Sequence, residues 1–456
     1  MSDDQHHADH DADRVAADRV YAELLDRIGE HAPQPRLEPT RRAVELLGDP
    51  QRSYGVIHIT GTNGKTSTSR IAESILRAHG LRTGLMTSPH LVRVNERIVI
   101  DGEPISDRAL ADNWADIQPY LLMVDAELTA NGEEPLTYFE ALTVLAFACF
   151  ADAPVDVAVV EVGMGGEWDS TNVVDGDVAV LTPIALDHTH RLGSTVAEIA
   201  RTKAGIIKPA AQVVTALQQT EAMDEITRAA EHDEATIVAE GVDFQVVDAR
   251  LAVGGQALTV RGRAGTYDEL LLPLFGPHQA QNAAIAIAAV ESFLGAGSQP
   301  LAPEVLAEGL AAVTSPGRLQ IIATEPTVLV DAAHNPHGAE ALARAVMGSF
   351  AFTAVTAVVG VLDDKDAHGI LAALDPVVER FVITQSDSER AIPAAELAEV
   401  AAQIAGPDRV MVAVDPEEAI AAARESSDAT AAVLVTGSIT LVGQAISIIA
   451  RENGDS

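Results

Sequence analysis

The sequence predicts an α/β protein of two domains, and three observations support this. The chain has 456 residues, which is room for about two or three domains at roughly 150 residues each. From Val56 onward, short runs rich in β-branched residues alternate with helical stretches, a pattern typical of a mostly parallel sheet with helices on both faces. Gly- and Pro-containing stretches at 295–300 and 314–317 interrupt the alternation, which then begins again. We therefore expect an N-terminal domain over residues 16–314 and a smaller, doubly wound C-terminal domain over residues 315–456.

The elements follow in this order. Residues 1–15 are acidic and polar, and we expect a disordered tail there. Helical patterns cover residues 16–28, 39–47, 66–79, 138–150, 195–204 and 277–294. Strands are expected at 56–60, 83–87, 156–162, 178–182 and 213–217, with an added hairpin segment over 242–272. In the C-terminal domain, strands are expected near 327–331, 353–360, 379–384, 409–414 and 432–436.

Composition excludes several classes of protein. The formal charge is −37, from 30 basic and 67 acidic residues, so a nucleic-acid partner is not expected. No apolar run approaches the roughly 18–20 residues that span a bilayer, and the acidic N-terminus has no apolar core of a secretory signal. Cys149 is the single cysteine, so no internal disulfide can form. We expect a cytoplasmic protein that does not act at a membrane.

A glycine-rich loop stands between the first strand and its helix. In Thr60-Gly-Thr-Asn-Gly-Lys-Thr-Ser67, the glycines allow backbone N–H groups to surround phosphate, and Lys65 can reach the terminal phosphates. Ile59 stands where the commonest phosphate-loop pattern has its first glycine. The context favours nucleotide binding, and an ordinary Gly-rich turn is the alternative.

Two further strands end in groups suited to a metal. Glu161 ends a buried strand, where Mg²⁺ beside a triphosphate would pair with it; the alternative is an acid that caps the next turn. An Asp-His pair, Asp187-His188, follows another strand, where open α/β sheets bind ligands. The helix after it carries Lys203, one of only four lysines. That lysine is either a counter-ion or a site that CO₂ carbamylates into an anionic ligand.

The second domain offers a weaker signal. Asp331 ends its first expected strand and precedes the polar turn Ala-Ala-His-Asn-Pro336. This edge can face the nucleotide, or Asp331 can merely cap the next helix. Arg318, at the boundary, can clamp a phosphate or pair with one of the many acids.

Taken in order, these segments resemble the folylpolyglutamate synthase and dihydrofolate synthase family of the Mur ligase superfamily. The resemblance covers about residues 21–450. It rests on the stretches Gly61-Thr-Asn-Gly-Lys-Thr-Ser67, Thr87-Ser-Pro-His-Leu91, Asn95-Glu-Arg-Ile98, Leu136-Thr-Tyr-Phe-Glu140, Glu161-Val-Gly-Met-Gly-Gly166, Trp168-Asp-Ser-Thr-Asn172, Leu186-Asp-His-Thr189, Lys203-Ala-Gly-Ile-Ile207, Phe275-Gly-Pro-His-Gln279 with Asn282, Pro316-Gly-Arg318, Asp331 to Pro336 and Val435-Thr-Gly-Ser438.

The resemblance implies an ATP-dependent amide ligase with a P-loop-type first domain and a Rossmann-like second domain. ATP would phosphorylate a carboxylate of a folate or of dihydropteroate, and the amine of L-glutamate would attack the acyl phosphate. The catalytic residues would be Lys65, Glu161, His188 and Lys203. ATP would contact Gly61, Thr62, Asn63, Gly64, Lys65, Thr66, Ser67, Asn282, Arg318, Asp331 and His334. One or two Mg²⁺ ions would be held by Ser88, Glu161, His188 and Lys203, the last as the carbamate.

The resemblance also places the pterin beside Thr137, Phe139, Glu167, Trp168 and Asp169. Glu167 stands where many relatives carry Arg, which reverses the charge expected beside the pterin, and His190 replaces a common Asp. Folate glutamylation, with dihydropteroate glutamylation in the same site, is the leading hypothesis, and a monomer is expected. A Mur-type ligase for cell-wall precursors and a regulatory P-loop NTPase remain as alternatives.

Overall fold

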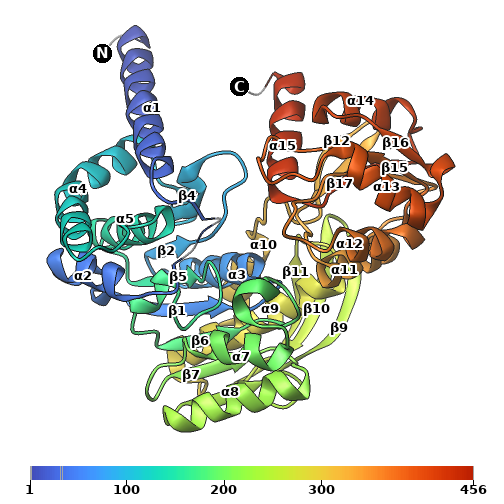
Figure 1. Ribbon diagram of the computed structural model, residues 1–456. Coiled ribbons are helices and arrows are strands. Elements are labelled where there is room, and N and C mark those ends of the chain that lie inside the picture. Colours follow the sequence, from blue (N-terminus) through green and yellow to red (C-terminus); the bar gives the residue numbers. More distant parts are fainter. Residues whose placement is uncertain (1–2, 31, 33, 455–456) are drawn as a thin grey trace.

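The computed structural model describes residues 3–454 except 31 and 33. Their backbone forms two open sheets, each covered by helices, and a small antiparallel sheet that follows the first in the chain (Figure 1). No helix among these residues is long and apolar enough to cross a bilayer. The predicted α/β class with two sheet-based halves is confirmed.

The N-terminal sheet has eight strands in the order β4-β3-β2-β5-β1-β6-β7-β8. Their bounds are β1 Gly55–Thr60, β2 Thr83–Met86, β3 Ile98–Ile100, β4 Glu103–Pro104, β5 Val157–Glu161, β6 Val178–Leu181, β7 Gln212–Thr215 and β8 Thr236–Ala239. All neighbours pair in parallel except β3, which is antiparallel to β2 and β4. The carboxyl ends of β1, β5 and β6 therefore meet at one edge.

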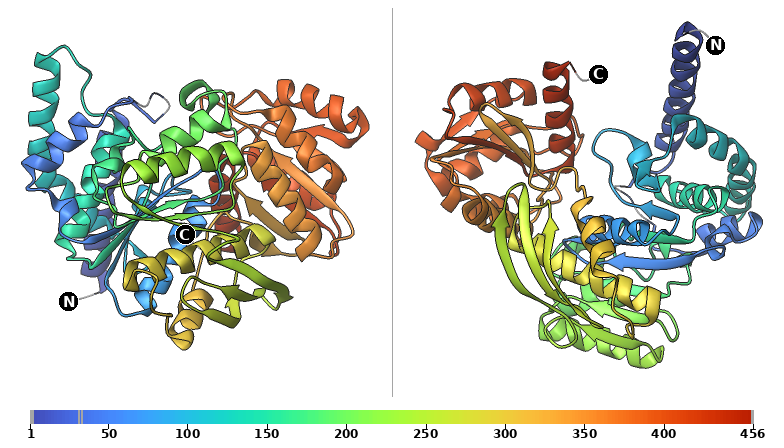
Figure 2. Two further views of the ribbon diagram at one scale, coloured as in Figure 1. Left: turned by 90° about the horizontal axis from the view of Figure 1, so that it is seen from below. Right: turned by 180° about the vertical axis from the view of Figure 1, so that it is seen from behind.

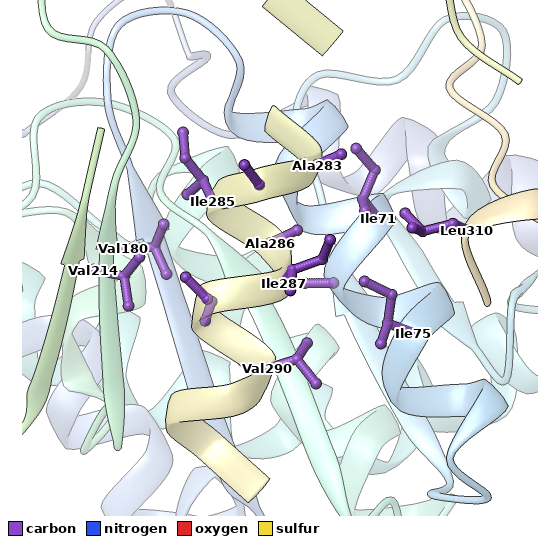
Figure 3. Close-up of a cluster of buried hydrophobic side chains, with 14 of the residues drawn as sticks. Ile71, Ile75, Val180, Val214, Ala283, Ile285, Ala286, Ile287, Val290 and Leu310 are labelled. Atoms are coloured by element: carbon purple, nitrogen blue, oxygen red, sulfur yellow. The ribbon is translucent and has the colours of Figure 1, made fainter. Parts of the chain in front are cut away.

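Helices cover both faces of this sheet. They are α1 Asp3–Leu25, α2 Glu38–Leu46, α3 Lys65–Ala78, α4 Asp107–Ala130, α5 Tyr138–Asp152, α6 Thr189–Leu192, α7 Val196–Ala204, α8 Thr220–His232, α9 Pro277–Gly295 and α10 Pro303–Ala311. On one face, Ile71 and Ile75 of α3 pack with Ile287 of α9 against the strands (Figure 3). Alternate residues of β5 face the opposite core with α4 and α5.

The small sheet consists of β9 Gln245–Ala252, β10 Gly255–Arg261 and β11 Thr266–Leu272, in the order β11-β10-β9. Both pairings are antiparallel. Beyond β11, the ring of Phe275 lies 4.9 Å from that of Phe350, at the end of α11 Pro336–Ser349. The segment after the small sheet thus contacts the C-terminal half.

The C-terminal sheet has six strands in the order β12-β13-β17-β14-β15-β16. They are β12 Gln320–Thr324, β13 Thr327–Asp331, β14 Val355–Val359, β15 Arg380–Ile383, β16 Val410–Val412 and β17 Ala432–Thr436. The remaining helices are α12 Ala367–Leu374, α13 Ala394–Ala405, α14 Pro416–Glu425 and α15 Ile439–Asn453. Separate hydrophobic clusters lie on the two faces of this sheet, as expected for a doubly wound domain, which lies beside the N-terminal one (Figure 2).

The largest departure from the sequence-based expectations is at the start of the chain. Residues 1–15 were expected to be disordered, but helix α1 begins at Asp3 (residues 1–2 lie outside the described residues). No Gly or Pro interrupts this stretch, and Ala17, Val20 and Leu24 are buried at helical spacing. These contacts anchor the second half of the helix, and its first half projects from the body of the protein (Figure 1).

Candidate functional site

A cavity of about 1120 Å³ lies between the two halves of the chain. Its walls include the phosphate loop and the ends of β1 and β5 from the N-terminal half, and the turn after β13 from the C-terminal half. A volume somewhat above the usual range of small-molecule sites leaves room for more than one ligand. The carboxyl ends of parallel strands thus form a site to which both sheets contribute.

The predicted phosphate loop links β1 to α3 with the geometry that its glycines require. Gly61 has φ +148°, and a Cβ there would lie 1.9 Å from Oγ1 of Thr182. Gly64 precedes the first turn of α3 with φ +88°. The Lys65 ammonium donates to the carbonyl oxygens of Gly61 and Thr62, each at 3.3 Å. Burial lowers the pKa of Lys65, and the charge of Glu161 opposes that change.

Glu161 is the clearest indication of a cation site. The side chain is buried at the end of β5, where Oε1 accepts a hydrogen bond of 3.0 Å from the Thr66 hydroxyl. Oε2 is buried and has no hydrogen-bond partner. Burial raises the pKa of this carboxyl, and Lys65 opposes the effect. A buried carboxylate oxygen without a partner is costly, and a bound cation would satisfy it.

Ser88 and His188 line the same cavity as Glu161. Burial lowers the pKa of His188 to about 4, so the imidazole is neutral at physiological pH and keeps a lone pair. Among the described residues, no group of three or more His, Cys, Asp or Glu side chains is arranged to hold a metal. The carboxylate of Glu161 and the hydroxyl of Ser88 suit Mg²⁺, which takes few protein ligands and completes its shell with phosphate and water.

Lys203 lies on the far side of the phosphate loop, on α7. It is buried, and its ammonium donates to the Gly61 carbonyl oxygen at 2.8 Å. It lines a separate small cavity of about 30 Å³ that it shares with His188. Burial, with a contribution from Lys65, lowers the pKa of Lys203 to about 7. A substantial fraction of the amine is therefore neutral at physiological pH.

Asp187 joins the two halves of the chain. Its Oδ1 accepts from the Lys365 ammonium at 2.8 Å, and its Oδ2 accepts from the Asn335 amide at 3.0 Å. His334 Nε2 lies 3.5 Å from Oδ2. Burial raises the pKa of Asp187, but the hydrogen bond with His334 and the surrounding positive charges lower it well below its usual range. Asn335 also exchanges amide hydrogen bonds with Asn63 of the phosphate loop, at 3.1 and 3.2 Å.

The remaining residues predicted for ATP also reach the main cavity. Asp331 ends β13, and its two oxygens accept from the backbone N–H groups of Leu319 and Ala333. Burial raises the pKa of Asp331, and Arg318, at the start of the C-terminal half, opposes that change. Asn282, on α9, is buried and donates to Gln279 at 3.0 Å. All three, with His334, line the cavity. Gly61 and Lys203 line only the small cavity.

The predicted pterin side is an aromatic part of the cavity. Thr137 caps α5, and Phe139, Trp168 and Asp169 line the wall beside it. Glu167 is the exception: its side chain is exposed and does not line the cavity. Its backbone is held instead, because its N–H donates to Thr202 and its carbonyl accepts from Asn172. The expected contact between Glu167 and a pterin is therefore wrong for this structure.

Sequence reasoning missed an ion pair on the same wall, in which Arg97 is buried and Glu30 is 38% exposed. Arg97 donates to both oxygens of Glu30, at 2.7 and 2.9 Å, and to His90 at 2.8 Å. Its guanidinium also lies 5.2 Å from the centre of the Tyr138 ring. Arg97 lies inside a stretch that the resemblance had singled out, but Glu30 follows α1 and carries no motif. Lys365 was missed too, although the scarcity of lysine pointed to it.

Two family models match the chain. The Mur ligase middle domain matches residues 59–290, and the Mur ligase glutamate ligase domain matches residues 317–439. A dihydrofolate synthase/folylpolyglutamate synthase of Mycobacterium tuberculosis is 43% identical over 467 residues, covering 96% of this chain and 95% of that protein. The Escherichia coli protein of the same name is 36% identical over 419 residues, covering 92% of each.

Solved structures agree with these matches. A Mycobacterium tuberculosis folylpolyglutamate synthase complexed with ADP superposes with a TM-score of 0.92 at 42% identity, covering 96% of this chain and 99% of that one. An Escherichia coli relative in complex with DHPP and ADP has a TM-score of 0.83 at 32% identity, covering 95% and 98%.

Proposed function

The chain belongs to the folylpolyglutamate synthase and dihydrofolate synthase family of the Mur ligase superfamily, and from this premise we propose how its cavity works. The enzyme is an ATP-dependent ligase that joins L-glutamate to a folate, and we propose that dihydropteroate is a second acceptor in the same site. The observation that carries the proposal is the cavity itself. It brings the phosphate loop and the unpartnered oxygen of Glu161 together with the aromatic side chains Phe139 and Trp168. The basic side chains Lys365 and Arg390 line the same cavity.

The nucleotide would bind at the phosphate loop. Residues 61–67 surround the phosphates, and Lys65 turns from the loop carbonyls toward the terminal phosphates. The rest of the proposed nucleotide site is lined by Asn282, Arg318, Asp331 and His334. In phosphoryl transfer most of the catalysis is positioning and charge neutralisation, which Lys65 and Arg318 provide.

Mg²⁺ fits beside the phosphates. Ser88, Glu161 and His188 would hold it, and when bound it would neutralise charge on the transferred phosphoryl group. Glu161 is suited to this role because one of its oxygens already has Thr66 and the other has no partner. His188 is suited because burial keeps its imidazole neutral.

We further propose that Lys203 is carbamylated. The neutral amine adds to CO₂, the nitrogen loses a proton, and a carbamate anion results. The lowered pKa of Lys203 supplies the neutral amine, and the small cavity next to the side chain offers space for the added carboxylate. The carbamate would supply an anionic oxygen ligand for a second cation. Arg cannot form this group.

The acceptor and the amino acid would occupy opposite parts of the cavity. The pterin ring would lie against Phe139 and Trp168, within reach of Asp169. L-Glutamate carries two carboxylates, and Lys365 and Arg390 provide positive charge on the C-terminal wall. The γ-phosphoryl group passes from ATP to the acceptor's carboxylate, and the amine of glutamate then displaces phosphate to form the amide.

Contact between the two halves would protect the acyl phosphate. Asp187 and Asn63, both of the N-terminal half, bond to Lys365 and Asn335 of the C-terminal half. Docking of the halves would surround the reacting groups with protein, which would limit hydrolysis. The monomeric state and the cytoplasmic location stay predictions.

The test is mass analysis of the products. The protein would be given ATP, Mg²⁺ and L-glutamate with dihydropteroate or with a tetrahydrofolate. We expect each acceptor to gain glutamyl residues and phosphate to be released only when all substrates are present. If the tetrahydrofolate is glutamylated and dihydropteroate is not, the proposed second activity is wrong. Phosphate release with neither acceptor nor glutamate would instead support the NTPase alternative, and the Lys65→Ala variant is the control for contaminating activity.

A further inference from the structure

Behind the pterin wall, three buried polar side chains form a chain of which the proposed reaction uses only Asp169. His58 lies on the central strand β1, and its Nε2 is 2.9 Å from the Thr171 hydroxyl. That hydroxyl is 2.5 Å from Oδ1 of Asp169, which lines the cavity. His58 and Thr171 are fully buried, and Asp169 is 4% exposed. Asp169 is thus the only member of the three that reaches the cavity.

The direction of the hydrogen bonds follows from the chemistry of the groups. An ionised carboxylate only accepts, so the Thr171 hydroxyl donates to Asp169 and its oxygen accepts from His58. This arrangement assigns the ring hydrogen of His58 to Nε2. The reverse direction would require a protonated Asp169 and a hydrogen on Nδ1 of His58, and Nδ1 is buried without a partner. A buried unpaired N–H is costly, so the chain favours an ionised Asp169.

The surroundings of His58 agree with this direction, whereas the burial of Asp169 acts against it. Burial lowers the pKa of His58 to about 3, which keeps the ring neutral. Burial raises the pKa of Asp169, and hydrogen bonds from Thr171 and from loop amides oppose it. The Thr171 N–H also donates to Oδ1 at 3.0 Å, and the Met164 N–H donates to Oδ2 at 2.8 Å. These donors stabilise the ionised form of Asp169, and its side chain also lines the cavity.

The same strand also holds the loop that carries these residues. Thr60, two residues after His58 and on the same face of β1, donates to the Gly165 carbonyl at 2.7 Å. From the other side, Thr143 of α5 shares a hydrogen bond of 3.0 Å with Ser170. Of these contacts, only the one from His58 leads on to the carboxylate in the cavity.

We propose that His58 is a positioning residue that acts through Thr171 to hold Asp169 as an ionised acceptor for the ring N–H donors of the substrate. This inference rests on the proposed pterin pocket and deepens it, because it specifies an acceptor-only group. The pocket would therefore select a heterocycle with N–H donors along one edge.

The experiment measures how tightly the full-length protein and its variants bind two ligands, dihydropteroate and ADP. Dissociation constants are measured by calorimetry for dihydropteroate in the presence of ADP, and for ADP alone. We expect His58→Leu to weaken dihydropteroate about tenfold, which is about 1.4 kcal/mol, while ADP binding changes less than twofold. His58→Gln, whose amide can supply the N–H, should recover affinity to within about threefold.

Thr171→Val breaks the chain in its middle and keeps the inference testable if His58→Leu folds poorly. It should weaken the binding of dihydropteroate about as much as His58→Leu does. The double variant should bind dihydropteroate no more weakly than Thr171→Val alone, because both changes break the same chain of hydrogen bonds. Thr143→Val is the matched control: it removes a buried hydroxyl contact to the same loop and should lower the melting temperature without changing the affinity for dihydropteroate.

Three results would overturn the inference. The first is a change below twofold in the affinity for dihydropteroate in both His58→Leu and Thr171→Val. The second is an equal loss of affinity for dihydropteroate and for ADP. The third is a loss of affinity in the double variant that equals the product of the two single losses. Asp169→Asn tests the proposed pterin pocket separately from the role of His58. If this change does not weaken dihydropteroate, the proposed pterin pocket fails. If it does and the His58 and Thr171 variants bind normally, only the role of His58 fails.

Discussion

Replacing Lys365 by Met should separate the two halves of the protein. The Lys365 and Asp187 side chains are only 7% and 9% exposed, and their charged atoms lie 2.8 Å apart. Removing one partner of a buried ion pair costs about 3–5 kcal/mol, because the other charge is left uncompensated. Asn335 and His334 continue to stabilise Asp187, so we expect the lower value, about 3 kcal/mol. That shifts the equilibrium between joined and separated halves about a hundredfold.

The assay is a distance measurement between labels on the two halves. The exposed positions Glu221 on α8 and Glu399 on α13 can be changed to Cys, and the native Cys149 is buried and does not compete for the label. Lys365→Met should broaden and lengthen the distance distribution in the absence of substrates. Adding Asp187→Asn removes the isolated charge and should restore much of the short-distance population. If the double variant is as open as Lys365→Met alone, the ion pair does not hold the halves together and the reasoning is wrong.

Four further predictions concern single positions. Lys65→Ala should lower kcat/KM at least a thousandfold with an unchanged melting temperature; near-normal turnover would remove the phosphate-loop assignment. Lys203→Arg should lose activity far more than a Lys→Arg change at Lys208, and full activity with or without bicarbonate would reject the carbamate. Glu167→Arg, on an exposed side chain outside the cavity, should change the ratio of rates with dihydropteroate and tetrahydrofolate less than twofold, so a larger change would place Glu167 at the pterin after all. Phe147→Ala, in the fully buried core of α5, should lower the free energy of unfolding by about 3–5 kcal/mol in chemical denaturation, and a loss below about 1 kcal/mol would contradict its burial.

The strands that carry the site were predictable because their local pattern is strong. β5 and β6 are buried on both faces, so they appear in the sequence as continuous apolar runs that end in polar residues, and β1 differs by the buried His58 in its middle. Strands β3 and β4 were missed, and they are short strands of three and two residues at one end of the sheet. Within the hairpin segment expected over residues 242–272, strand β9 runs unbroken over Gln245–Ala252. Its side chains are largely exposed, so the sequence there carries little alternation.

The chemistry of the site was less predictable where it depends on contacts between distant segments. Glu161, His188 and Ser88 could be found because each stands next to a recognisable motif. The pair of Arg97 with Glu30 joins residues 67 positions apart, and no local pattern announces it. Glu167 shows the opposite error: its neighbours Trp168 and Asp169 line the cavity, but the backbone turn directs Glu167 to solvent. Position next to a motif does not determine which way a side chain points.

The paired amides of Asn63 and Asn335 have a consequence for the order of events. One of these residues belongs to the loop expected to wrap the phosphates, and the other begins a helix of the opposite half. Occupancy of the loop and docking of the halves are therefore coupled equilibria. By thermodynamic reciprocity, however much a nucleotide favours docking, docking must favour the nucleotide by the same factor. Nucleotide affinity in this enzyme thus depends on both halves. Measuring the nucleotide affinity of the N-terminal half alone would show how much the C-terminal half contributes to it.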